Sequence, residues 1–240
     1  MIIDHRENDE FLEQARQDRV PQGLGINNNL DNNLRFKVGS FNIILGHANV
    51  GKTYWVLWYF LALSKIHGKK HLIYAAENSV NGLKRWGVTE FMKNIQAIDK
   101  KYDSIMIDPI NAFQRPRGVN AHENDYETAS KLRLYAKHFK TSIYVCMHAS
   151  TEALRKVHPT KHAFEGLPIP PSGADAEGGG KWINRCDDFI TIHRYTQSEM
   201  CWMNTYLHIK KVKETEKGTA QEYKKNKNKK IKDFTKEEKR

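Results

Sequence analysis

Eight consecutive residues have the types and spacing needed to hold a chain of phosphates. The octet is Gly46-His47-Ala48-Asn49-Val50-Gly51-Lys52-Thr53, and it matches the phosphate-loop pattern G-x-x-x-x-G-K-[ST] at every fixed position. In such a loop, successive backbone N–H groups point into one concavity and hold phosphate oxygens. We expect Lys52 to reach the β- and γ-phosphates of a nucleotide, and the hydroxyl of Thr53 to bind Mg²⁺. The alternative is a glycine loop that fits the pattern by chance.

The sequence on both sides of the octet favours the phosphate-loop interpretation. Residues 41–45 form a short apolar run typical of a buried strand, and residues 54–66 are long and apolar enough for a core helix. Strand, loop and helix in this order are the setting in which the pattern is credible.

The rest of the chain alternates between predicted strands and predicted helices. Further strands are predicted at 71–76, 104–107, 142–147 and 188–193, a strand or hairpin arm at 202–213, and helices at 78–98, broken near Gly87, and at 123–140. The second helix is expected to place one apolar side inward, made of Ala129, Leu132, Leu134, Tyr135, Ala136 and Phe139. Alternation of this kind predicts an α/β fold with a mainly parallel sheet, whose ligands collect at the carboxyl ends of the strands.

Nucleotide hydrolysis needs carboxylates, and two lie directly after predicted strands. Asp108 follows the run Ile105–Ile107, which is the position of a Walker B residue that holds Mg²⁺. Glu77 follows the strand 71–76, which we expect beside the strand of the phosphate loop, and it is the candidate general base. The alternatives are an Asp that only starts a turn and a Glu that only suits a helix N-terminus.

Size and charge limit the class of protein. With 240 residues and a formal net charge of +11, the chain can hold one large domain and has a balance that favours nucleic acid or another anionic surface. Three scattered cysteines favour a reducing cytosol and argue against a zinc ribbon. The acidic N-terminus predicts no signal peptide, and no apolar run is long enough to span a bilayer, so we expect no membrane association.

The composition divides the chain into three predicted parts. Residues 1–34 are expected to be a polar helix and a linker, residues 35–220 the catalytic domain, and residues 221–240 a basic tail with nine Lys/Arg against four Asp/Glu. The tail is either a solvated disordered segment or an arm that contacts phosphates. Residues 150–180 have few apolar side chains and are expected to form a functional or a disordered loop.

The series of motifs resembles the replicative hexameric helicases of the DnaB type, including the phage and Twinkle-like branch. The resemblance rests on the octet, on Glu77 after the second strand, on Asp108, and on the glycine-rich stretch 172–188 that leads into a strand ending at Arg194. It covers about residues 22–220. It implies a RecA-like ATPase domain that uses ATP and Mg²⁺, with Glu77 as the catalytic glutamate.

Two further positions are assigned through this resemblance, and both depart from the family pattern. Lys211 and Lys213 correspond to a Lys and an arginine finger that reach the γ-phosphate of a neighbouring subunit. A lysine lacks the planar fork of arginine, so either Lys213 does this work less well or Arg194 or another Arg takes it. His148 stands where the family usually has a glutamine that senses the γ-phosphate, and the alternative is a strand-end His without a role.

By resemblance, DNA contacts belong to the loops that follow Asp108 and His148. The first loop offers Gln114, Arg115, Arg117 and Asn120, and the second offers Arg155, Lys156, His158 and Lys161. Basic loops at this edge suit phosphate tracking. Aromatic side chains are sparse in these loops (Phe113 and Phe164), so we expect contact with the DNA backbone in preference to base stacking. Ordinary solvated basic loops are the alternative.

The resemblance implies a ring helicase or translocase on single-stranded DNA in phage-like replication, in a bacterial or phage-infected cytosol. It implies a homo-hexamer and a separate primase, polymerase or loader, because the chain has no room for a primase domain. The alternative is a RecA-like recombination or regulatory ATPase that binds DNA without processive unwinding. A third possibility is the motor half of a split system.

Overall fold

A single six-stranded sheet organises the computed structural model, which describes residues 23–75, 87–98, 101–115 and 118–213. The strand order is β2-β3-β4-β1-β5-β6. The first five strands of this order pair in parallel, and β6 pairs antiparallel with β5. The strands are β1 (Phe41–Gly46), β2 (His71–Ala75), β3 (Ser104–Asp108), β4 (Ser142–His148), β5 (Asp188–His193) and β6 (Tyr206–Lys211). The predicted mainly parallel α/β fold is therefore confirmed.

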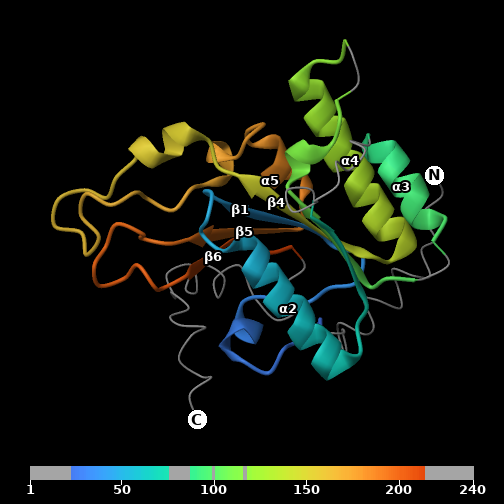
Figure 1. The fold of residues 1–240 in the computed structure, drawn as a ribbon, viewed down its shortest axis with the longest axis horizontal. Helices are drawn as coiled ribbons and strands as arrows, with labels where there is room; N and C mark the ends of the chain where they lie inside the picture. The colour runs from blue at the N-terminus through green and yellow to red at the C-terminus, as the bar shows by residue number, and fades with distance from the viewer. Residues whose placement is uncertain (1–22, 76–86, 99–100, 116–117, 214–240) are drawn as a thin grey trace, which may run out of the picture.

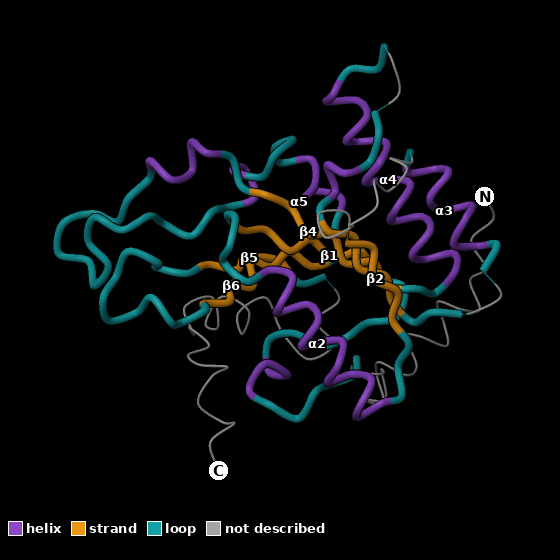
Figure 2. The backbone as a smooth tube through the Cα atoms, viewed as in Figure 1, coloured by secondary structure: helices purple, strands orange, loops and turns teal. Residues whose placement is uncertain are grey.

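Helices cover both faces of this sheet (Figures 1 and 2). The α-helices are α2 (Lys52–His67), α3 (Val88–Gln96), α4 (Ala121–Phe139) and α5 (Lys181–Arg185), and the 3₁₀ turns are η1 (Asn29–Asn32), η3 (Ile110–Ala112), η4 (Thr151–Arg155) and η5 (Gly173–Asp175). α3 begins directly after Gly87, where the sequence predicted a break; the segment 76–86 lies outside the described residues.

Successive side chains of the strands point to opposite faces of the sheet and contribute to two separate apolar cores. In β1, Ile43 and Leu45 face the core that packs under α3, α4 and α5, whereas Ile44 faces the core under α2. Because successive side chains of a strand point to opposite faces, a strand buried on both faces must be apolar throughout. This is why β1, β3 and β4 read as continuous apolar runs in the sequence.

Residues 24–36 form part of the second core, although the sequence placed most of them in a linker. Ile26, Leu30, Leu34 and Phe36 are buried against the α2 face. The turn at η1 is held by a capping box, in which Asn28 accepts from the Leu30 N–H and the Asp31 carboxylate accepts from the N–H groups before it. Asparagine and glycine thus build a compact turn here.

Three details of the sequence prediction are wrong. Leu134 and Phe139 do not belong to the inward side of α4, because they are 70% and 38% exposed. The β6 arm begins at Tyr206 and not at Trp202, which lies in an exposed turn. The strand β2 does not lie beside β1, because it pairs with β3 at the edge of the sheet.

An ion pair ties the amino ends of the strands together. Lys37 Nζ donates to Asp188 Oδ1 over 2.6 Å and to the Lys213 carbonyl oxygen over 2.5 Å. The Asp188 side chain is only 1% exposed, and burial raises its pKa against the lowering effect of Lys37. The carboxylate therefore depends on this lysine for compensation of its charge.

Within the described residues, no helix is both long and apolar enough to cross a membrane.

Lys37→Met is expected to lower the free energy of unfolding by about 3 kcal/mol, because removing one partner leaves a buried charge uncompensated. The control is Lys131→Met, which breaks the exposed i,i+4 pair with Glu127 and should change stability by less than about 0.5 kcal/mol. Equilibrium unfolding in urea measures both values. Equal losses in the two variants would show that the Lys37–Asp188 pair contributes no more than a surface pair.

Candidate functional site

The octet Gly46–Thr53 joins the carboxyl end of β1 to the first turn of α2. A side chain at Gly46 would meet the Ile192 carbonyl oxygen at 2.6 Å, so glycine is required for the close approach of β5. Gly51 is the N-cap of α2 and has φ of 94°, in the left-handed region that favours glycine. Both fixed glycines of the pattern therefore have a local physical reason.

Lys52 is the first residue of α2, and its ammonium folds back against the loop formed by residues 46–51. Its Nζ donates to the carbonyl oxygens of Gly46 over 3.0 Å and of His47 over 2.8 Å, and the residue is 6% exposed. The N–H groups of the first helical turn have no partner within the helix and carry partial positive charge. The lysine and the helix N-terminus together make this turn a favourable place for phosphate oxygens.

Thr53 and Asp108 meet across the sheet. The Thr53 hydroxyl donates to Asp108 Oδ2 over 2.5 Å, and Asp108, the last residue of β3, is 7% exposed. These are hard oxygen ligands, and a pair of them suits Mg²⁺, which keeps several of its waters and takes few protein ligands. The residues present therefore fit the ion that the sequence predicted at this place.

His148 ends β4 and lies beside the loop. The sheet register pairs it with Gly46, and its Nδ1 is 3.4 Å from Lys52 Nζ. Because an ammonium only donates, Nδ1 is the accepting atom of this contact. The structure thus brings His148 to Lys52; its role as a phosphate sensor stays a prediction.

One residue near the loop, Asp175, was not singled out by the sequence, and another, His47, was predicted only as a member of the octet. His47 is part of the octet, and burial together with Lys52 lowers its pKa. Asp175 is 8% exposed and ion-pairs with Lys156. Burial would raise the pKa of Asp175, but hydrogen bonds from Lys156 and Ser172 lower it to about 2. The signal for Asp175 is the spacing Ser172-x-x-Asp175, which forms a capping box.

The predicted DNA residues are distributed over two loops at the carboxyl edge of the sheet. Arg155 and Lys161 are exposed in the loop after β4, and Arg115 is exposed in the loop after β3. Lys156 lies in the loop after β4, with its ammonium bound to Asp175. Arg117 lies outside the described residues.

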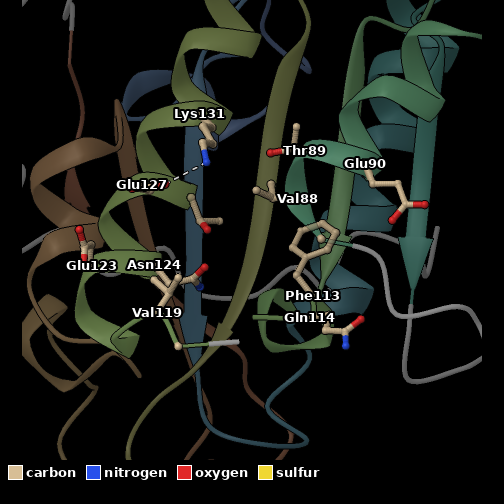
Figure 3. Close-up of a pocket in the computed structure, with 13 residues that line it drawn as sticks. Val88, Thr89, Glu90, Phe113, Gln114, Val119, Glu123, Asn124, Glu127 and Lys131 are labelled. Carbon is tan, nitrogen blue, oxygen red and sulfur yellow. Dashed lines mark hydrogen bonds and ion pairs between the residues drawn. The ribbon is translucent and has the colours of Figure 1, made fainter. Parts of the chain in front are cut away.

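The flank of the first loop is acidic. A groove of about 400 Å³ separates this loop from α3 and α4, and Figure 3 shows Glu90, Glu123 and Glu127 around it, with the cation Lys131 paired with Glu127. Phe113 in its wall packs on Phe91, with ring centroids 5.1 Å apart. The groove itself is thus poorly suited to phosphates, and Arg115 is the described cation that this loop offers.

Lys211 and Lys213 lie at the amino ends of the parallel strands, whereas the phosphate loop lies at their carboxyl ends. β5 runs parallel to β1 and β6 returns antiparallel, so the end of β6 lies beside the amino end of β5. Lys211 Nζ donates to the carbonyl oxygens of Ile183 and Cys186 over 2.6 and 2.7 Å, and Lys213 Nζ is 3.7 Å from Asp187 Oδ1. Neither reaches its own phosphate loop.

Two other sequence predictions concern Arg194 and Glu77. Arg194 follows β5 at the same edge as the phosphate loop, and its guanidinium donates to the Met203 carbonyl oxygen over 3.2 Å. Glu77 lies outside the described residues. The strand that leads to it pairs with β3 so that Ala75 lies opposite Asp108.

A pH dependence of stability follows from His193, which ends β5 and is 2% exposed. Burial, with His47 and His158 nearby, lowers its pKa to about 4. Between pH 6.5 and 4 the unfolded chain therefore binds a proton that the folded chain does not, and the free energy of unfolding falls as the pH falls. In His193→Gln, the loss between pH 6.5 and 5 should be smaller by up to about 2 kcal/mol.

Urea unfolding at several pH values measures this difference, and His138→Gln, at an exposed histidine of α4, serves as the matched control. The comparison with the parent is needed because burial also lowers the pKa values of His47 and His71, which act in the same direction. An unchanged pH dependence in His193→Gln would contradict the assignment.

Solved structures with the same architecture place the fold. An ATPase domain matches with a TM-score of 0.67 at 12% identity, over 88% of this chain and 91% of that chain. A DnaB-like replicative helicase, described with its interactions with primase, matches with a TM-score of 0.64 at 13% identity, over 88% of this chain and 62% of that one. A KaiC-like protein from the archaeon Pyrococcus horikoshii matches with a TM-score of 0.54 at 15% identity, over 81% and 88%.

No protein-family model and no curated protein matches the chain. At identities of 12 to 15% the likeness shows the fold. The resemblance to DnaB-type ATPase domains is confirmed at that level, and the fold of the chain is that of the RecA-like P-loop ATPases.

Proposed function

We propose that this chain is an ATP hydrolase that works as a ring-shaped translocase or helicase on single-stranded DNA. The observation that carries the proposal is the arrangement of Lys52, Thr53 and Asp108 at one turn, with the Thr53 hydroxyl 2.5 Å from the Asp108 carboxylate. Phosphate-binding N–H groups, a buried ammonium and a pair of oxygen ligands for Mg²⁺ are the parts that phosphoryl transfer to water requires.

In the proposed reaction a water oxygen forms a bond to the γ-phosphorus, and the bond from that phosphorus to the bridging oxygen of ADP breaks. Lys52 and the N-terminus of α2 stabilise the negative charge on the phosphate oxygens. Glu77 is proposed to orient the water and take its proton, and His148 to contact the γ-phosphate. Mg²⁺, held by Thr53 and Asp108, supplies charge neutralisation when bound.

The assembly and the DNA contacts belong to the same proposal. Lys213 of one copy, with Lys211, would serve the nucleotide of the next copy in a homo-hexamer. Arg115, Arg117, Arg155, Lys156 and Lys161 would contact DNA phosphates, with the basic residues 221–240 as a further arm beyond the domain 35–220. The DnaB-like neighbour interacts with primase; by analogy, a separate primase, loader or polymerase would act with this chain in phage-like replication in the cytosol.

A second function is favoured by one observation. Lys213, which stands where an arginine finger is expected, lies 3.7 Å from Asp187 in its own chain, and a lysine lacks the bidentate fork. This supports a RecA-like ATPase that holds DNA or a partner without processive unwinding. The motor half of a split system remains the third reading.

Lys52→Ala is expected to reduce ATP turnover at least about a hundredfold, because it removes a preorganised charge from the transition state. Lys65→Ala, at the exposed last turn of the same helix, is the matched control and should keep the parent's rate. Phosphate release with ATP and Mg²⁺ measures both. Turnover that survives in Lys52→Ala would remove the octet from the mechanism.

DNA binding is expected to weaken steeply as salt increases, because cations on the loops replace counterions on the phosphates. Arg155→Ala should reduce the slope of log affinity against log salt by about 0.7, the value for one contact on a single strand. Fluorescence anisotropy with labelled single-stranded DNA measures the slope, and a flat response would contradict the basic loops.

A forked DNA substrate in the same conditions separates the two functions. Strand displacement that requires ATP supports the helicase, whereas binding and hydrolysis without displacement support the second function.

A further inference from the structure

The loop after η4, residues 156–169, has a fixed backbone. The His158 N–H donates to the Leu167 carbonyl oxygen over 2.9 Å, and the Gly166 N–H donates back to the His158 carbonyl oxygen over 3.1 Å. The Ile169 N–H donates to the Lys156 carbonyl oxygen over 2.8 Å. These bonds close the loop on itself. In Figures 1 and 2 it extends from the carboxyl edge of the sheet, beside the loop that joins β5 to β6.

Aromatic rings from both loops stack on one another here. The rings of His158 and His162 lie 4.0 Å apart with planes 7° from parallel, and those of Phe164 and Tyr195 lie 4.1 Å apart at 14°. His158 Nε2 and the Tyr195 hydroxyl are hydrogen-bonded over 3.0 Å. Tyr195 is 3% exposed and packs edge-on against Tyr206 of β6. Phe164 is the aromatic residue that the sequence analysis noted in this loop. In the structure, the rings of His158, His162, Tyr195 and Tyr206 lie around it.

His162 is the outermost ring of this cluster. The residue is exposed, and one face of its imidazole rests on His158. Its Nδ1 accepts a hydrogen bond from the Phe164 N–H over 3.1 Å, which fixes the rotation of the ring. An exposed ring held in a fixed orientation gains little from burial. Because the residue is exposed, a flat partner can reach the ring from solvent.

The charges around His162 indicate which flat partner would fit. Lys161 precedes it and is exposed, with its backbone in the left-handed region at φ of 70° and its N–H bound to Glu165 Oε2 over 2.9 Å. Arg155, also exposed, is the last residue of η4 and directly precedes this loop. A planar group joined to phosphates, as in a nucleotide chain, matches an exposed ring in a stretch that also carries exposed Lys161 and Arg155.

We propose that His162 is a stacking platform for a nucleobase of single-stranded DNA, backed by His158 and the Phe164–Tyr195 pair. The proposal rests on the proposed DNA-binding function and extends it. The loop after η4 would contact a base in addition to the phosphates of the DNA backbone. Stacking of this kind tolerates any base, since every base has a π-face. It would therefore add affinity for single strands without sequence preference.

The test compares a single-stranded oligonucleotide with an abasic one of equal length and phosphate count. The full chain, with ATP and Mg²⁺, should bind the base-containing strand on the order of tenfold tighter, as loss of one stacked base predicts. In His162→Ala the ratio of the two dissociation constants should fall toward one, and in His162→Phe it should be retained. His138→Ala, an exposed histidine at the last turn of α4, should behave as the parent.

Each result has one reading. Equal binding of the two strands by the parent, with tight binding of both, overturns the platform and leaves the proposed DNA binding intact. A ratio that His162→Ala does not change also overturns it. Binding of neither strand overturns the proposed function itself. Fluorescence quenching of free 2-aminopurine riboside that depends on His162 as strongly as quenching within a strand would assign the platform to free nucleotides and overturn the DNA assignment.

Discussion

The hydrogen bond between Thr53 and Asp108 is the contact on which the candidate site depends. The strand order places β4 between β1 and β3, so the first turn of α2 must reach across the end of β4 to meet Asp108. His148, the last residue of β4, lies under this crossing, 3.4 Å from the Lys52 ammonium. Because β4 lies between β1 and β3, its last residue, His148, is placed at the site together with Lys52 and Asp108. If β1 and β3 were adjacent, no strand end would lie between them to supply this side chain.

The charged residues at the amino ends of the parallel strands and those at their carboxyl ends are arranged differently. At the amino edge, buried carboxylates are matched by cations: Asp188 by Lys37, and Asp187 by Arg133 over 3.0 Å. Lys211 and Lys213 take part in this edge through the end of α5 and through Asp187. A lysine that served a neighbouring copy would have to leave these partners, and it would leave the Asp187 carboxylate with Arg133 as its remaining cation among these residues. At the carboxyl edge, the helix N-terminus and Lys52 concentrate positive charge for a ligand.

Local patterns predicted the strands well, because the central strands are mostly apolar on both faces, and β3 and β4 end in polar residues at the candidate site. Asp108 was identified in this way, whereas His148 was identified through the resemblance to a helicase family. Pairing between distant segments was not predictable: nothing local places β2 at the edge beside β3, and the helical period alone did not reveal that Leu134 faces solvent. The ring cluster was missed for the same reason, since Tyr195 and Tyr206 come from a different loop and strand than His158 and His162. Histidines are also not counted as aromatic when a sequence is read for stacking.

A continuous series of contacts joins the phosphate loop to the ring cluster. The Ala149 N–H donates to the Gly46 carbonyl oxygen over 3.2 Å, and Lys52 holds the same oxygen from the other side. Ala149 pairs with Ala176, and the Ser150 N–H donates to the Asp175 carbonyl oxygen over 2.8 Å. The Asp175 carboxylate in turn binds Lys156, at the base of the loop that carries His162. The orientation of the imidazole is set inside its own loop, whereas the position of that loop is set by residues that also contact the phosphate loop. The same short stretch of chain, residues 148–156, therefore lies beside the candidate phosphate loop and sets the place where a base would stack.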